Sequence, residues 1–199
     1  MIESLVTILR DKNTSMAEFR QVSQIICDLL AARVSKEMNE TKVTVTTPLK
    51  KTYGKKLDEN ILLVPILRSG MVFLPSFMKM FSSAAVGFIG IRRDEKTALP
   101  HIYYENIIND CKDFKIVILD PMIATGGSTI AAIKRLVTQQ SVAENILITS
   151  IIASEDGINA ILKTFPKVKV TTAIIDPELD ENKFIIPGLG DFGDRFFGT

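Results

Sequence analysis

One stretch of the chain combines an acid, two glycines and several hydroxyl groups in a pattern that suits phosphate binding. An apolar run at residues 116–119 is followed by Asp120 and then by Gly126 and Gly127, just before a predicted helix. The glycines let the backbone turn its N–H groups inward at the positive end of that helix. Hydroxyl donors stand beside them, at Thr125, Ser128 and Thr129. No lysine follows the glycines, so the pattern of a P-loop nucleoside triphosphatase is absent.

Asp120 gives a second clue to the ligand, because a carboxylate beside a phosphate would repel it. The repulsion is on the order of 1 to 4 kcal/mol at 4 Å in water or near a protein surface. Asp120 is therefore expected to accept hydrogen bonds from hydroxyl groups instead. A ligand that offers both a phosphate and a vicinal diol is a ribose 5-phosphate. The plainer alternative is an aspartate that merely ends a buried strand before a Gly-Gly turn.

A second turn between a strand and a helix carries one arginine in an otherwise apolar stretch. Arg68 directly follows the apolar residues 61–67, where an unpaired charge would be costly to bury. Its guanidinium, with the backbone amides of Ser69 and Gly70, would suit a second anion such as pyrophosphate. The alternative is that the arginine pairs with a nearby carboxylate and that the glycine only allows the turn. This motif alone does not distinguish an anion site from such an ion pair.

A glycine-rich segment near the C-terminus suits a planar base. Residues 184–195 read Phe-Ile-Ile-Pro-Gly-Leu-Gly-Asp-Phe-Gly-Asp-Arg. Glycine lets backbone C=O and N–H groups approach a base closely enough to match its donors and acceptors, and Phe184 and Phe192 would supply flat apolar walls. Taken alone, the segment would be interpreted as a solvated loop packed by its aromatic side chains.

The elements that must position these motifs alternate between strands and helices from residue 61 onward. Strands are predicted at residues 61–66, 84–91, 116–119, 146–152 and 170–175, and helices at 71–81, 128–140 and 155–164. Continuous apolar strands are typical of a parallel sheet that is covered on both faces. The sequence therefore predicts an α/β fold with a mainly parallel sheet and helices on both faces. Ligands should gather at the C-terminal ends of the strands.

The remaining segments are less regular. A capping-box pattern at Ser15 predicts an amphipathic helix over residues 15–35, and the β-branched residues 43–47 predict a short strand. Residues 50–60 are expected to be a polar connection. Residues 92–106 interrupt the alternation of strands and helices. They are interpreted as a protruding arm, either mobile or in contact with a second subunit. The tail at 184–199 is expected to be too glycine-rich for a helix.

The composition predicts a single globular domain over residues 1–199. Its 46% apolar and 24% charged residues support a real core, and a net charge of +1 provides no broad field for nucleic acid or an anionic membrane. Cys27 and Cys111 have no metal-ligand spacing and suit a reducing compartment. No apolar run is long enough to span a bilayer. A cytoplasmic protein without a nucleic-acid or membrane partner is expected.

Taken together, the motifs resemble those of the uracil phosphoribosyltransferase family in both order and spacing. The resemblance is carried by Pro65-Ile66-Leu67-Arg68-Ser69-Gly70, Arg93-Asp94-Glu95-Lys96-Thr97, residues 120–128 and residues 187–195, with Arg10-Asp11 near the start. Relatives that act on other bases usually carry two acids where this sequence has Asp120-Pro121. The resemblance therefore implies a type I phosphoribosyltransferase-like fold with a C-terminal base-binding hood. It also implies an enzyme of pyrimidine salvage that converts uracil and phosphoribosyl pyrophosphate (PRPP) to uridine monophosphate (UMP) and pyrophosphate.

The same resemblance implies the roles of individual residues. Those expected to bind PRPP are Arg68, Ser69, Gly70, Arg93, Asp120, Pro121, Met122, Ile123, Ala124, Thr125, Gly126, Gly127, Ser128 and Asp191. Those expected to bind uracil are Ile185, Gly190, Asp191 and Phe192, and the expected catalytic residues are Asp191 and Arg68. The expected cofactor is Mg²⁺, held through substrate oxygens and water rather than by protein ligands. A homodimer or larger homo-oligomer is expected, with GTP as a candidate allosteric effector.

Two rival functions share these motifs. One is a phosphoribosyltransferase for another base, which a panel of bases would separate. The other is a regulator that senses PRPP or a nucleotide, with RNA as a candidate partner for a local basic face at Lys50, Lys51, Lys55 and Lys56.

Overall fold

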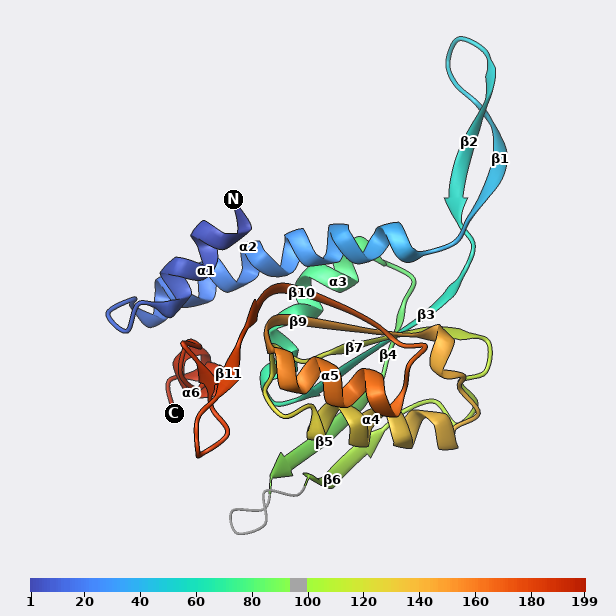
Figure 1. Cartoon of the computed structure of the whole chain (residues 1–199). Helices are drawn as coiled ribbons and strands as arrows, with labels where there is room; N and C mark the ends of the chain where they lie inside the picture. Colours follow the sequence, from blue (N-terminus) through green and yellow to red (C-terminus); the bar gives the residue numbers. More distant parts are fainter. Residues whose placement is uncertain (94–99) are drawn as a thin grey trace.

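The computed structural model describes residues 1–93 and 100–199 and is built around one central sheet (Figure 1). The strand order is β10-β9-β7-β3-β5-β6. These strands are β3 (Asn60–Leu67), β5 (Phe88–Arg93), β6 (Pro100–Asn106), β7 (Phe114–Leu119), β9 (Ile146–Ser154) and β10 (Lys169–Asp176). Neighbours run parallel except for β6, which pairs antiparallel with β5 at one edge. The predicted mainly parallel α/β sheet is confirmed.

Helices cover both faces of this sheet (Figure 1). On one face lie α1 (Ile2–Arg10), α2 (Met16–Val34) and α3 (Leu74–Met80); on the other lie α4 (Gly127–Thr138) and α5 (Glu155–Thr164). One buried apolar cluster joins Phe19 of α2 to Leu63 of β3, and a second joins Ile133 of α4 to Ile116 of β7. Strands buried on both faces need apolar side chains at every position, which explains their continuous apolar sequences.

Most predicted helices and strands are present, with small changes at their ends. The Ser15 hydroxyl accepts a hydrogen bond from the Glu18 amide at 3.3 Å, as the capping pattern predicts. The predicted helix at 71–81 is divided into a 3-10 segment, Ser69–Phe73, and α3. The predicted strand at 84–91 is likewise divided into β4 (Ala85–Val86) and β5. Further short elements are 3-10 helices at Ser35–Glu37 and Ala143–Asn145, and β8 (Met122–Ile123).

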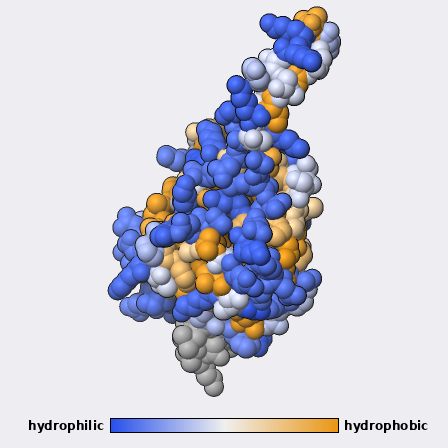
Figure 2. Space-filling view, turned by 90° about the vertical axis from the view of Figure 1, so that its right-hand side faces the viewer, coloured by the Kyte–Doolittle hydropathy of each residue, from blue (hydrophilic) through white to orange (hydrophobic). Residues whose placement is uncertain are grey.

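The prediction of a connection at residues 50–60 was wrong. β1 (Glu40–Thr46) and β2 (Lys51–Leu57) pair antiparallel as a hairpin, and Figures 1 and 2 show this hairpin extending away from the body. Both of its faces are solvent-accessible, so its sequence has little of the apolar alternation that marks a half-buried strand. Of the segment 92–106 that was interpreted as an arm, residues 100–106 form edge strand β6, and residues 94–99 lie outside the described part of the chain.

The C-terminal segment lies over the edge of the sheet where the parallel strands end (Figure 1). It consists of β11 (Glu178–Leu179), β12 (Ile185–Ile186) and α6 (Phe192–Phe197), and residues 178–197 are called the hood below. The prediction that residues 184–199 contain no helix was wrong. Asp191 caps α6 by accepting a hydrogen bond from the Asp194 amide at 3.0 Å, and Phe192 packs against Phe19 with ring centroids 5.2 Å apart. Cap and packing stabilise a short helix despite its glycine.

None of the helices in the described ranges is both long enough and apolar enough to cross a lipid bilayer.

Candidate active site

Three polar segments meet at one edge of the sheet. Residues 68–70 follow β3, residues 120–128 follow β7, and the hood follows β10, and these parallel strands end on the same side (Figure 1). The carboxyl ends of parallel strands are the usual place for a ligand in an open α/β sheet. The fold therefore brings together the motifs that were singled out in the sequence.

The loop at residues 120–128 is fixed by its neighbours in the sheet and by α5. The Asp120 amide donates to the Thr149 carbonyl at 3.1 Å, and the Asp120 side chain accepts from the Met122 amide at 3.4 Å. Ser154, which caps α5, donates its hydroxyl to the Ala124 carbonyl at 2.5 Å. Gly126 has a φ of +75°, so a residue with a side chain would be strained there. The loop is thus held in one shape at the N-terminus of α4, where an anion is favoured.

A cavity of about 260 Å³, called the inner cavity, opens between this loop, β3 and the hood. Its lining residues are Ile66, Leu67, Ser69, Ile91, Asp120, Met122, Ser128, Asp191, Phe192 and Gly193. Asp120 is only 8% exposed, yet it faces the cavity beside the hydroxyl residues Ser69 and Ser128. Acceptors and hydroxyl donors in one small cavity suit a ligand that carries both hydroxyl groups and an anion.

Arg68 stands beside the inner cavity rather than in its wall. The Arg68 guanidinium carbon lies 5.8 Å from the centre of the Phe197 ring, in a cation–π arrangement with α6. Gly70 packs so closely against the Leu119 backbone that a side chain there would collide with the Leu119 carbonyl. The turn after β3 is therefore pressed against the end of β7, with Ser69 in the cavity wall and the exposed Arg68 one residue before it.

A second cavity of about 290 Å³, called the hood cavity, lies under the hood. Its lining residues are Met122, Ala124, Asn182, Lys183, Phe184, Ile185, Gly190 and Asp191. Met122 and Asp191 line both cavities, so the two adjoin. Three of the four residues expected to bind uracil, Ile185, Gly190 and Asp191, lie in this wall.

The two aromatic side chains expected as flat walls are placed differently. Phe184 lines the hood cavity and is 51% exposed. Phe192 lines the inner cavity instead; it is almost fully buried, and its ring contacts those of Phe19 and Phe196. Met122 and Ala124, expected at the phosphate loop, also line the hood cavity. Their apolar side chains gave no sequence signal for contact with a base.

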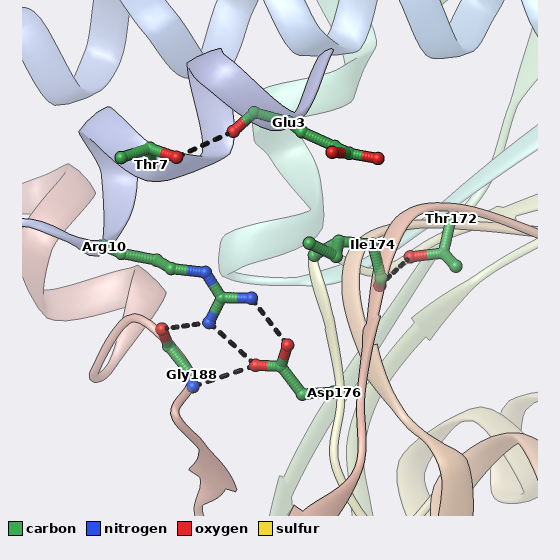
Figure 3. Close-up of polar contacts among 7 residues, drawn as sticks. All are labelled: Glu3, Thr7, Arg10, Thr172, Ile174, Asp176 and Gly188. Atoms are coloured by element: carbon green, nitrogen blue, oxygen red, sulfur yellow. Dashed lines mark hydrogen bonds and ion pairs between the residues drawn. The ribbon is translucent and has the colours of Figure 1, made fainter.

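The backbone of the hood is tied to the N-terminal helix by charged side chains that sequence reasoning did not assign. Arg10 of α1 donates from Nη1 to Asp176 Oδ2 at 2.8 Å and from Nη2 to Oδ1 at 2.5 Å. Arg10 Nη1 also donates to the Gly188 carbonyl at 2.8 Å, and the Gly188 amide donates to Asp176 Oδ2 at 2.9 Å (Figure 3). Burial raises the pKa of the Asp176 carboxyl, but the hydrogen bonds from Arg10 and the Gly188 amide outweigh it and leave the pKa below its ordinary value.

One residue expected to bind PRPP, Arg93, cannot be placed in this geometry. Arg93 ends β5, but its side chain is not among those described. In the described ranges, no group of three or more His, Cys, Asp or Glu side chains is arranged to hold a metal ion.

The comparisons with known proteins agree over the full length of the chain. The family model described as uracil phosphoribosyltransferase matches residues 1–199. Curated relatives named uracil phosphoribosyltransferase include those of Dictyoglomus turgidum, 41% identical over 200 residues, and Limosilactobacillus fermentum, 38% identical over 200 residues. Each alignment spans 100% of this chain, with 96% of the first relative and 95% of the second.

Solved structures give the same answer for the fold. The AQ2163 protein from Aquifex aeolicus has a TM-score of 0.90 at 32% identity, covering 100% of this chain and 94% of that one. A hypoxanthine-guanine phosphoribosyltransferase from Bacillus anthracis has a TM-score of 0.51 at 11% identity, covering 81% and 80%, which supports the fold alone. On the full-length match of the family model and the identity to its curated members, this chain belongs to the uracil phosphoribosyltransferase family.

Proposed function

We propose that PRPP binds in the inner cavity, that uracil binds in the hood cavity, and that the transfer takes place where the cavities meet. The chain is a phosphoribosyltransferase that forms UMP and pyrophosphate from uracil and PRPP. The observation that carries the placement is that Met122 and Asp191 line both cavities. A base in one cavity and a ribose in the other would have their reacting atoms side by side.

The inner cavity offers the groups that the sugar phosphate needs. The N-terminus of α4 and the Ser128 hydroxyl would hold the 5′-phosphate, as the phosphate-loop pattern predicts. Asp120 would accept hydrogen bonds from the ribose hydroxyl groups. Ser69 and Arg68 would face the pyrophosphate, for which Arg68 must turn its guanidinium from the Phe197 ring towards the cavity.

In this arrangement the protein works chiefly by alignment. The uracil nitrogen attacks ribose C1 as pyrophosphate leaves from the opposite face, and the proton of that nitrogen passes to Asp191 or to a bound water. Positive charge develops on the sugar ring in the transition state. Holding two reactants in the correct geometry can supply roughly 7 to 11 kcal/mol of the barrier. Asp191, placed between the cavities, would orient a substrate hydroxyl or a bound water and would stabilise the developing positive charge.

The donor set fits Mg²⁺ bound mainly through the substrate. Mg²⁺ prefers oxygen ligands and keeps several waters, and the inner cavity supplies the Asp120 and Asp191 carboxylates beside the expected PRPP oxygens. When bound, the ion would neutralise charge on the leaving pyrophosphate. Asp120 and Asp191 would hold its waters or the ribose hydroxyl groups in place.

Asp191→Asn tests this placement with little risk to the fold. Asparagine caps a helix about as well as aspartate, so α6 should form in the variant. We expect kcat to fall by roughly a hundredfold or more, the range for loss of a group that assists proton transfer or charge stabilisation. Asp194→Asn is the matched control, since Asp194 lies on the same helix but lines neither cavity. Equal kcat values for the two folded variants would remove Asp191 from the site.

We also propose that residues 1–199 form one domain that assembles with further copies of itself. The two apolar clusters lie on opposite faces of the same sheet, which supports one folding unit. An isolated two-stranded hairpin is marginally stable in water, yet the β1–β2 hairpin carries Leu49 at 94% exposed and Tyr53 at 70% exposed. Packing of this hairpin on a second copy would cover both side chains. Light scattering of the wild type and of Leu49→Ser tests this, with a smaller assembly expected for the variant.

Two further expectations remain predictions. If GTP is an allosteric effector, added GTP should speed the reaction at low PRPP concentration. A cytoplasmic location predicts that the protein is recovered in the soluble fraction of its own cells.

A further inference from the structure

We propose that Arg10 and Asp176 are positioning residues for uracil: they fix the backbone of residues 188–190 from the side away from the cavities and touch neither substrate. The inference rests on the proposed placement of uracil in the hood cavity. Neither side chain lines the hood cavity or the inner cavity. Their effect on the reaction must therefore pass through the backbone that they hold.

Arg10 and Asp176 form hydrogen bonds with both backbone groups of Gly188. The Gly188 carbonyl accepts from Arg10 Nη1 at 2.8 Å, and the Gly188 amide donates to Asp176 Oδ2 at 2.9 Å (Figure 3). Both peptide planes that flank Gly188 are thereby fixed by charge-assisted hydrogen bonds. Gly190, in the wall of the hood cavity, is only two residues further along. A rotation at Gly188 would move Gly190 out of the position described above, whereas Asp191 is held separately as the cap of α6.

A second guanidinium, that of Arg195, binds the carbonyl of the next residue, Leu189. Arg195 Nη1 donates to the Leu189 carbonyl at 2.8 Å, and Arg195 Nη2 donates to the Asp11 carbonyl at 2.7 Å. Arg195 also bonds the Leu9 carbonyl. The carbonyls of residues 188 and 189 are thus both bound by arginines that are attached to the C-terminal end of α1. This helix contributes no residue to either cavity, but it forms the support on which the base-binding backbone rests.

The burial of the ion pair favours a positioning role over a purely stabilising one. The side chain of Asp176 is 4% exposed and that of Arg10 is 22% exposed. A buried ion pair loses so much hydration that apolar residues of the same volume often stabilise a protein as well or better. What apolar residues cannot do is bind both the N–H and the C=O of Gly188. The geometry imposed on the hood is therefore the distinctive contribution of this pair.

The experiment measures steady-state kinetics of Arg10→Lys and Asp176→Asn with uracil and PRPP varied separately. Lysine keeps the positive charge beside Asp176 but cannot make the bidentate pair and reach Gly188 together. We expect KM for uracil to rise roughly tenfold or more, the effect of losing a hydrogen bond to a charged group. KM for PRPP should change by less than about twofold, because the inner cavity does not use residues 188–190.

Arg135→Lys is the matched control. Arg135 makes a comparable bidentate pair with Glu105, at 2.5 and 2.6 Å, but this pair joins α4 to β6 and lines neither cavity. Its KM for uracil should equal that of the wild type. The double variant Arg10→Lys/Asp176→Asn should be little worse than either single variant, because residues that act as one unit give non-additive losses.

The outcomes separate this inference from the proposed function. If the wild type forms no UMP, the proposed function fails before the variants are compared. If the wild type is active and both variants keep its KM for uracil, the positioning inference is overturned. An equal rise of both KM values, or a lower melting temperature with unchanged KM values, also overturns it. Should Asp176→Asn fail to fold, Arg10→Lys alone decides, with circular dichroism confirming its native fold.

Discussion

Replacing Gly126 with alanine would damage the phosphate loop through its backbone, without removing any polar group. Gly126 has a φ of +75° at the N-cap of α4. A Cβ atom at this position would lie 2.7 Å from the Gly157 carbonyl oxygen and 3.1 Å from Ile161 Cγ1. The first neighbour is backbone at the start of α5, so the loop or the helix must move to make room.

The expected loss of stability follows from these two effects. A left-handed backbone costs a residue with a side chain roughly 1 to 2 kcal/mol. Overpacking in a closely packed region typically lowers stability by about 1 to 3 kcal/mol. Alanine also lowers the conformational entropy of the unfolded chain, which offsets about 0.4 to 1 kcal/mol of this loss. The free energy of unfolding should therefore fall by about 2 to 4 kcal/mol, and displacement of the loop should weaken PRPP binding at least roughly tenfold.

Urea unfolding and calorimetric titration with PRPP measure the two quantities. Gly54→Ala is the control: Gly54 lies in β2 with negative φ, and a Cβ atom there would meet nothing within 4 Å. This control should be neutral or slightly more stable, with unchanged PRPP affinity. A Gly126→Ala variant that matches wild type in both measurements would refute the described loop geometry and its role in binding phosphate.

Two further predictions concern one titrating group and two residues with positive φ. Arg10 and the Gly188 amide hold the pKa of Asp176 below its ordinary value of about 3.9. The ionised carboxylate therefore stabilises the fold above that pH. This stabilisation is lost as the pH falls through the folded-state pKa. The difference in unfolding free energy between the wild type and Asp176→Asn should therefore be constant near neutral pH and shrink below about pH 4; urea unfolding at several pH values would contradict this if the difference grew with acid. Lys183 and Gln140 have φ values of +67° and +66°, so Lys183→Gly and Gln140→Gly should each raise stability by about 0.5 to 1 kcal/mol after the entropy of glycine is subtracted. Lower thermal melting temperatures for both would contradict that prediction.

The sequence predicted the layers of the fold well because burial on both faces leaves a local signal. The apolar runs at 61–66, 116–119 and 146–152 correspond to β3, β7 and β9, the central strands. The Gly126-Gly127 turn was placed correctly before α4, since only a glycine accepts the backbone angle at position 126 without strain.

The elements that were missed carry weak or misleading local signals. In α1, Ile2, Leu5 and Leu9 do recur at helical spacing, but the segment is short and was not assigned to a helix. In α6, one glycine inside the helix and several around it hid a helix that depends on the Asp191 cap and on contacts with Phe19. The strand predicted at residues 43–47 corresponds to β1, but β2 has no buried side to produce a pattern and was missed.

Some of the site could not be predicted from local patterns at all. Arg10 and Gly188 are 178 residues apart, and only the folded chain shows that they are bonded. The same holds for Met122, whose apolar side chain gains its place between the two cavities only from the packing of the hood.

Product formation by the purified protein shows which base it uses. The protein would be given PRPP and Mg²⁺ with uracil, cytosine, hypoxanthine, adenine or orotate in separate reactions. We expect UMP and pyrophosphate in equal amounts with uracil and no nucleotide with the other bases. Product with another base would contradict the assigned specificity, and PRPP binding without product from any base would contradict an enzymatic role and favour a regulator.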